Sequence, residues 1–441
     1  MKRSPPHHHR PPDYHRDHAR PRSAPAPSPA AMEERLTELI SPATYALTAE
    51  YRRLGLRWRI LSLPMMVAML LALIWRQIPS VSTLVEVLTR EPLLWVPPRR
   101  VSQQAFSQRL QSLPASLMHD VVQQVLPTLE ERSLARSRPR PATIEHALTH
   151  FERLWVFDAT TLEELFHRVK ALRDQAGSIP AGKLVGVLDL VSKLPVTLWY
   201  ESDAALNERF AVPSLQEVVS AGTLVLFDRG FYSFALFDWL TDQQCGFITR
   251  SRTDSAFAVQ QVLVKTDRVR DRIIAFGQFR SNPAQYPVRL IEVQMGERWQ
   301  GYLTNVLDPQ ILSTAQVVDL YGRRWRIEEA FSLVKRLLGL SYVWTGTANG
   351  IQLQVWATWL LYAVLVDLSD AVAQELDVCL DQVSLEMVFR GLYFFAGAFQ
   401  RGEASDPVAY LAAQDDLGIV KRRRKYRERE RLQNYPPELI L

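Results

Sequence analysis

Two aspartates in this sequence stand where a sheet can present carboxylates to a metal ion. Asp158 and Asp228 each follow a short apolar run, residues 154–157 and 223–227, that is typical of a buried strand. A strand end keeps the backbone fixed while the side chain leaves the sheet, so two adjacent strands can hold two carboxylates a few ångströms apart. Mg²⁺ prefers oxygen ligands and would remove their mutual repulsion. Two such ions about 3.5–4 Å apart stabilise the attacking and leaving oxygens of an in-line displacement at phosphorus. Aspartates at strand ends are common in α/β proteins, so a third residue is needed to identify a site.

A polar helix face supplies a candidate for that third residue. Tyr321, Arg324, Glu328 and Lys335 lie at offsets 0, 3, 7 and 14 in the sequence. At about 100° per residue, all four project within about 60° of one face of a helix. Glu328 would complete the metal coordination, Arg324 and Lys335 would bind phosphates, and Tyr321 would hydrogen-bond the nucleic-acid backbone. The alternative is a solvated helix face on which Arg324 and Glu328 form an ordinary i,i+4 ion pair.

The spacing Tyr321-x2-Arg324-x3-Glu328-x6-Lys335 resembles the Y-R-E-K signature of DDE transposases from bacterial insertion sequences. The branch is insertion-sequence family four, whose members move DNA by cut and paste. Three other segments also resemble this family: Asp158-Ala159-Thr160, Asp228-Arg229-Gly230-Phe231 and Leu303-Thr304-Asn305. The resemblance is good over residues 150–345 and looser over the N-terminal helices.

This resemblance implies an α/β fold with an RNase H-like catalytic core, formed by residues 153–250 and about 314–400. An antiparallel β-region, residues 253–312, would be inserted into the core. Asp158, Asp228 and Glu328 would be both the catalytic residues and the ligands of two Mg²⁺ ions, which Mn²⁺ can replace. The partner would be double-stranded DNA, both transposon ends and target, held by a homodimer because two ends are cut together.

The DNA contacts that the resemblance implies are Tyr321, Arg324, Lys335 and Arg229. In members of the family that form DNA hairpins, a tryptophan of the inserted β-region stacks on a flipped base, an interaction typically worth about 1–3 kcal/mol. Trp299 is the nearest candidate here. Strand parity leaves Tyr302 as an alternative, and Trp299 can also be read as a core residue.

Apolar periodicity divides the chain into four parts. Residues 1–31, rich in proline and histidine, are expected to be a disordered tail, with Met32 as a possible true start. Residues 32–147 read as a helical DNA-binding domain in which Ser102 caps a short amphipathic helix. Residues 148–400 alternate strands and helices and form the expected catalytic domain. Residues 401–441 are expected to be a basic tail, since residues 421–431 hold eight Lys or Arg.

Composition excludes several other classes of protein. The net charge of +5 fits a polyanionic partner without requiring one. Two cysteines, Cys245 and Cys379, build neither a disulfide framework nor a zinc motif, and no signal peptide is visible, so a cytoplasmic, nucleoid-associated protein is expected. The apolar runs 61–75 and 351–368 read as buried core helices rather than membrane spans. No phosphate-binding glycine loop occurs, so no nucleotide cofactor is expected.

The remaining polar candidates read as structural. Asp189, Glu201 and Asp203 are expected at the surface or as caps of turns, and His146, His150 and His167 lack metal-ligand partners.

The function expected from these patterns is Mg²⁺-dependent cleavage at terminal inverted repeats, followed by transfer of the 3′-hydroxyl into target DNA. One alternative is a catalytically silent, transposase-derived DNA-binding protein, which would not need three converging carboxylates. Another is a metal-dependent nuclease without strand transfer, which the sequence does not separate from a transposase. Terminal inverted repeats flanking the gene would distinguish them.

Overall fold

A computed structural model describes residues 30–56, 59–162, 182–203, 206–252, 256–277, 282–338, 344, 347–421 and 436. The expected N-terminal tail lies almost wholly outside these ranges. His167 lies outside them as well, and so does the basic run that follows Lys421.

The centre of the molecule is a mixed sheet whose first five strands have an RNase H-like order. They are β1 (Arg153–Thr161), β2 (Lys183–Asp189), β3 (Pro195–Glu201), β4 (Thr223–Phe227) and β5 (Gly246–Arg250), and they lie in the order β3-β2-β1-β4-β5. β1, β4 and β5 are parallel, whereas β2 runs antiparallel to both of its neighbours. The expected RNase H-like core is therefore present.

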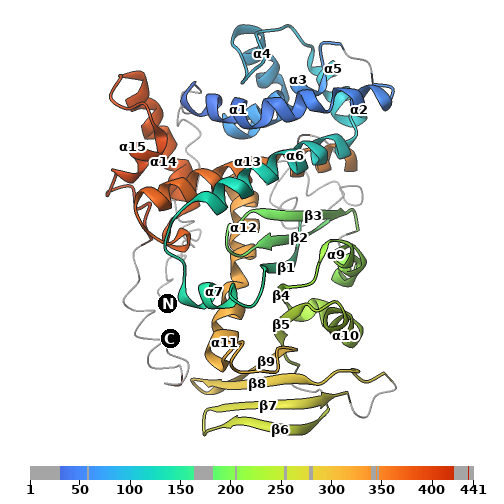
Figure 1. The fold of residues 1–441 in the computed structure, drawn as a ribbon. Helices are drawn as coiled ribbons and strands as arrows, with labels where there is room; N and C mark the ends of the chain where they lie inside the picture. Colours follow the sequence, from blue (N-terminus) through green and yellow to red (C-terminus); the bar gives the residue numbers. More distant parts are fainter. Residues whose placement is uncertain are drawn as a thin grey trace, which may run out of the picture.

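The expected β-region extends this sheet instead of standing apart from it. Its strands are β6 (Phe257–Lys265), β7 (Val269–Phe276), β8 (Val288–Met295) and β9 (Arg298–Thr304). β9 pairs antiparallel with β5, with Arg250 opposite Tyr302, so the sheet continues as β5-β9-β8-β7-β6 (Figure 1). Backbone pairing consequently continues from the core into the β-region without a gap in the sheet.

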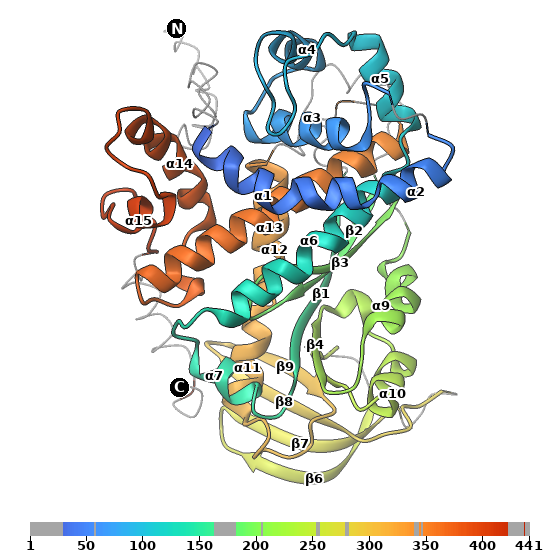
Figure 2. The same ribbon diagram turned by 45° about the horizontal axis from the view of Figure 1, so that its top comes forward.

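Helices cover both faces of the sheet because each strand alternates apolar side chains between two cores. On one face, α9 (Val212–Val218) and α10 (Phe234–Asp242) pack on a core that contains Phe157, Phe227 and Phe247. On the other face lie α11 (Thr314–Arg323), α12 (Trp325–Arg336) and the long α13 (Ala348–Glu375) (Figures 1 and 2). The second face is the one on which the candidate site is built.

The N-terminal helices cover α13, and three of them pack on it directly. They are α1 (Ala30–Ala46), α2 (Thr48–Arg53), α3 (Leu63–Trp75), α4 (Val81–Arg90), α5 (Gln103–Ser112), α6 (Ala115–Ala135) and α7 (Ala142–Ala147). α3, α5 and α6 contact α13, and their apolar residues join one continuous core with it (Figure 2). Ser102 caps α5 as expected, accepting a hydrogen bond from the Ala105 N–H. The buried Phe106 and Leu110 hold that helix in the bundle.

The two apolar runs are core helices. Every residue of α3 is buried. Within the described chain, α13 alone has the length and hydropathy that would allow a membrane crossing, yet 89% of its most apolar window is buried inside the protein. Its Asp367 is also fully buried and accepts hydrogen bonds from Arg35 and Arg136, both at 2.6 Å. These ion pairs fasten α1 and the end of α6 to α13.

The expectation of a tail from residue 401 onward is wrong for residues 401–421. The chain after α14 (Leu385–Gln400) forms α15 (Pro407–Ala412), which packs on α13 and α14 through the buried Leu411. Ile419 is 2% exposed, and Val420 forms a β-bridge with Val383. Deletion from residue 418 onward would therefore remove the buried Ile419 from the core.

Candidate active site

Asp158 and Asp228 lie side by side because of the register between β1 and β4. The last residues that these two parallel strands pair are Phe157 and Phe227, and the aspartates come next in each chain. Asp228 ends its strand as expected. Asp158 does not, because β1 continues to Thr161 by pairing with β2 alone. Phe157 and Phe227 point into the core under α9 and α10, so alternation directs both aspartates toward α11 and α12.

The signature residues do not lie on one continuous helix. The helix breaks at Arg324, where the Arg324 N–H donates to the Tyr321 carbonyl at 3.0 Å and the Ile327 N–H donates to the Arg324 carbonyl at 3.2 Å. Each of these bonds spans three residues instead of four, so α11 ends and α12 begins at this point. The expectation of one unbroken helix face is therefore wrong, although the side chains still converge.

Tyr321 and Arg324 connect the break to the three carboxylates. The Tyr321 hydroxyl donates to Asp228 Oδ1 at 3.2 Å. The Arg324 guanidinium donates to Asp158 and, through Nη2, to Glu328 Oε1 at 2.7 Å. The i,i+4 ion pair of the alternative interpretation thus exists, but it is not a solvated pair. Arg324 is 5% exposed and bridges two carboxylates from different elements.

Lys335 closes the site at the other end of α12. Its Nζ donates to the Thr160 hydroxyl and to the Thr161 carbonyl, the latter at 2.8 Å. This contact ties the last turn of α12 to the end of β1, the segment that directly follows Asp158. The structure therefore brings Tyr321, Arg324, Glu328 and Lys335 together with both aspartates.

The electrostatics of Asp158 show that the three carboxylates share one environment. Burial raises the pKa of Asp158 to about 7, while Arg324 and the Ala159 N–H oppose the shift. The negative charges of Glu328 and Asp228 raise the pKa of Asp158 further. Three carboxylates that repel one another beside a single guanidinium form a site that favours additional positive charge.

The donor set suits a hard divalent cation, since it consists of carboxylate oxygens. Among the described residues, no three His, Cys, Asp or Glu side chains are grouped closely enough to hold a metal ion as they stand. The reason is visible at Arg324, whose guanidinium lies between Asp158 and Glu328 and supplies the positive charge there. A metal ion at this site would compete with the Arg324 guanidinium for one oxygen of Asp158 and one oxygen of Glu328.

The two aromatic candidates on β9 lie on opposite faces of the sheet. Tyr302 belongs to the core on the α11 side, and its ring packs edge-on against Tyr321 with centroids 5.4 Å apart. Trp299 lies on the same face of β9 as Leu303, because the two residues are four positions apart, and Leu303 belongs to the opposite core. Trp299 is 38% exposed and is covered by the Arg270 guanidinium at 4.3 Å, so it is not a core residue. Parity thus places Tyr302, at 3% exposure, beside the site.

Other candidates take the positions that their sequence context suggests. Arg229 is exposed in the short 3₁₀ turn after Asp228. Asp189 accepts hydrogen bonds from the turn after β2, and Glu201 accepts from Ser202 and from the Asp203 N–H, so both cap turns as expected.

Sequence reasoning missed Trp325, the first residue of α12. Its side chain is 59% exposed, and its ring lies 5.4 Å from the Arg324 guanidinium. A large aromatic side chain so exposed beside a charged site is unusual. The available signal was its position inside the signature, directly after Arg324.

The chain is similar to a known protein family and to solved structures. Residues 149–364 match the family model described as the transposase DDE domain. No curated protein matched the sequence. A cryo-EM structure of a piggyBac transposase synaptic complex with hairpin DNA resembles the chain at 13% identity and a TM-score of 0.42, with 91% of this chain and 89% of that chain covered.

The match spans β1 to β9 and reaches into α13, so it contains both aspartates, the helix break and Glu328. Residues 149–364 of this chain are therefore similar to the transposase DDE domain.

Proposed function

We propose that this protein is a cut-and-paste DNA transposase of the Y-R-E-K branch, in which Asp158, Asp228 and Glu328 hold two Mg²⁺ ions. The observation that supports this proposal is the convergence of three carboxylates, from β1, the end of β4 and α12, around Tyr321 and Arg324. A protein that only binds DNA has no need of three converging carboxylates, which repel one another and the phosphates of DNA.

Bound Mg²⁺ would polarise the scissile phosphate and activate the attacking oxygen. The protein side chains would orient the groups around it. The Tyr321 hydroxyl holds one oxygen of Asp228, leaving the other free to act as a ligand. Arg324, once it releases a carboxylate, presents a planar fork of N–H donors that matches a phosphate. Lys335 ties α12 to the end of β1, and its ammonium group would lie beside the phosphate backbone of bound DNA.

DNA would lie across the edge of the sheet where Asp158 and Asp228 emerge. Arg229 is exposed there, and Trp325 offers an aromatic surface for an unstacked base. Trp299 remains a second candidate for that stacking, on the other face of the sheet. Because cut and paste requires two ends to be processed together, the active form would be a homodimer on double-stranded DNA.

The test uses Asp158→Asn, Asp228→Asn and Glu328→Gln on DNA that carries the inverted repeats flanking the gene. Each change keeps the shape of the side chain but removes a charged ligand, so Mg²⁺-dependent cleavage should be abolished while binding to the ends is nearly retained. Glu329→Gln is the matched control, since Glu329 is the next residue of α12, is mostly exposed and pairs with Arg326 instead. Its cleavage rate should stay near that of the wild type.

Three outcomes would redirect the proposal. If any triad variant cuts near the wild-type rate, that residue is not a ligand. If cleavage depends on the triad but pre-cut ends are never joined to target DNA, the protein is a metal-dependent nuclease without strand transfer. A wild-type protein that binds the ends without cutting them would be a silent descendant of a transposase.

A further inference from the structure

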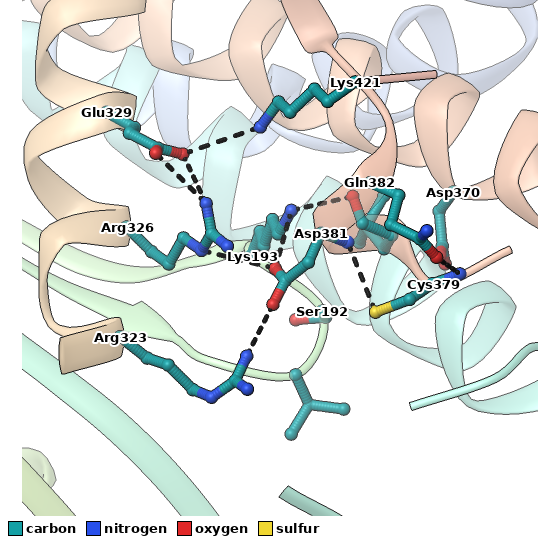
Figure 3. Close-up of polar contacts among 12 residues, drawn as sticks. Ser192, Lys193, Arg323, Arg326, Glu329, Asp370, Cys379, Asp381, Gln382 and Lys421 are labelled. Atoms are coloured by element: carbon teal, nitrogen blue, oxygen red, sulfur yellow. Dashed lines mark hydrogen bonds and ion pairs between the residues drawn. The ribbon is translucent and has the colours of Figure 1, made fainter. Parts of the chain in front are cut away.

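A second charged cluster lies behind the helix break, away from the three carboxylates. Its centre is Asp381, in the 3₁₀ turn Leu380–Gln382 that follows α13. The Asp381 carboxylate is 2.7 Å from Arg323 Nη1, 3.1 Å from Lys193 Nζ and 3.3 Å from Arg326 Nε. Figure 3 shows these three cations converging on the one carboxylate, which we call the Asp381 cluster.

The two arginines of the cluster flank Arg324 in the sequence. Arg323 is the last residue of α11, and Arg326 lies in the first turn of α12. Tyr321 and Arg324 point toward the catalytic carboxylates, whereas Arg323 and Arg326 point the opposite way to Asp381. The break is therefore held from both sides.

The backbone at the break has little rigidity of its own. The bonds across Arg324 span three residues, which is a poorer geometry than that of an α-helix. Gly322 also lies in this turn, and glycine lowers helix preference more than any residue except proline. The angle between α11 and α12 consequently depends on side-chain contacts.

Asp381 is itself firmly placed. Cys379 and Gln382 cap its turn, because the Cys379 Sγ accepts from the Asp381 N–H and the Gln382 side chain accepts from the Cys379 N–H. The Lys421 N–H donates to the Gln382 carbonyl at 2.6 Å. Lys193 Nζ donates to the Leu380 carbonyl at 2.9 Å, which joins the turn to the β2–β3 connection.

The charges of the cluster reinforce the contact. Burial would raise the pKa of Asp381, but Lys193, Arg326 and Arg323 outweigh it and hold the pKa at about 2. Burial lowers the pKa of Lys193 to about 8, even though Asp381 favours its charged form. Asp381 is thus a fixed negative charge to which both arginines of the break are drawn.

From this geometry we infer that Asp381 is a positioning residue for the catalytic site: it sets the angle of the α11–α12 break and so places Arg324 and Glu328 against Asp158. This inference rests on the proposed function for its catalytic consequence. Its structural consequence, a fixed helix break, does not depend on any activity.

The experiment compares full-length Asp381→Asn with a matched variant, Asp367→Asn. Asp367 is also a buried carboxylate held by several arginines, but these come from α1 and α6 and lie away from the break. Three quantities are measured on each protein: hydrogen exchange of residues 321–328, Mn²⁺ binding by electron paramagnetic resonance, and single-turnover cleavage of end DNA against Mg²⁺ concentration.

Asp381→Asn should speed exchange at residues 321–328 at least tenfold and weaken Mn²⁺ binding at least fivefold. It should raise the Mg²⁺ concentration for half-maximal cleavage by a similar factor. Asp367→Asn should destabilise the α1–α13 contact while leaving all three readouts within twofold of the wild type. Asp381→Glu, which keeps the charge, should recover part of the loss.

Equal exchange at residues 321–328 in the wild type and Asp381→Asn would overturn the inference, as would equal effects of the two Asn variants on Mn²⁺ binding. If the wild type neither binds Mn²⁺ nor cuts, the proposed function fails, and the exchange measurement still decides whether Asp381 fixes the break.

Discussion

A buried ion pair that links the β-region to α11 offers the sharpest stability prediction. Asp271 on β7 accepts hydrogen bonds from Arg289 Nε at 2.8 Å and Nη2 at 2.5 Å, and both side chains are 0% exposed. Arg289 Nη1 also donates to the Leu312 carbonyl at 2.6 Å, and the Thr314 hydroxyl donates to Asp271 at 2.6 Å. Thr314 is the first residue of α11, so this pair connects β7 and β8 to the helix that carries Tyr321.

Removing one partner leaves the other as an uncompensated buried charge. Arg289→Met or Asp271→Leu should each lower the local unfolding free energy by about 3–5 kcal/mol. The double variant removes both charges. Its remaining loss is that of two unpaired groups, the Leu312 carbonyl and the Thr314 hydroxyl, at about 1–3 kcal/mol each. The double variant should therefore lose less stability than the sum of the two single variants.

The measurement is native-state hydrogen exchange of β7, β8 and α11, which reports local opening free energies in a chain too large for one global two-state value. Exchange should accelerate at both the β-region and α11 in the single variants, because the pair joins them. Single variants that lose less than about 1 kcal/mol, or a double variant that loses the sum of both, would refute the reasoning.

Four further outcomes are expected. The pKa of Asp381 is about 2 in the folded protein, below its ordinary value of 3.8. Its carboxylate should therefore stabilise the fold by roughly 2 kcal/mol above pH 4, and this contribution should be lost as the pH falls toward 2. The free energies of unfolding of the wild type and Asp381→Asn should consequently converge near pH 2. Deleting residues 422–441 should weaken binding to end and random DNA alike at low salt, whereas deleting residues 418–441 should also destabilise the fold by about 2–5 kcal/mol through loss of a buried isoleucine. Trp325→Ala should alter stability by less than about 0.5 kcal/mol yet weaken binding of cleaved ends by about 1–3 kcal/mol; unchanged binding would remove Trp325 from the DNA path. Lys335→Ala should reduce the log–log salt slope of end binding by about one, and an unchanged slope would leave Lys335 as a purely structural tie to β1.

The sequence alone was sufficient to predict the elements that carry the candidate site. An apolar run before each aspartate predicts a strand, and the spacing from Tyr321 to Lys335 predicts a helical segment, because both periodicities are local properties of the chain. Local sequence patterns likewise predict the helix that Ser102 caps and the strands of the RNase H-like core. The roles of the individual site residues stay predictions until variants are measured.

Contacts between distant segments decided the rest. The register of β1 against β4 sets Asp158 beside Asp228, and the pairing of β9 with β5 turns the expected insertion into part of the core sheet. At the helix break, Arg324 pairs with Asp158 and Arg323 pairs with Asp381, and these partners are 166 and 58 positions apart in the sequence.

The dependence on distant contacts also explains two features that the sequence analysis missed or predicted wrongly. Periodicity could not show that Trp325 is left exposed, because exposure depends on which elements fail to cover a residue. It could not show that residues 401–421 are folded, because that segment is short and becomes ordered by packing on α13 and α14. Local propensity fixes which elements form, whereas burial and charge pairing across the chain decide where their side chains meet.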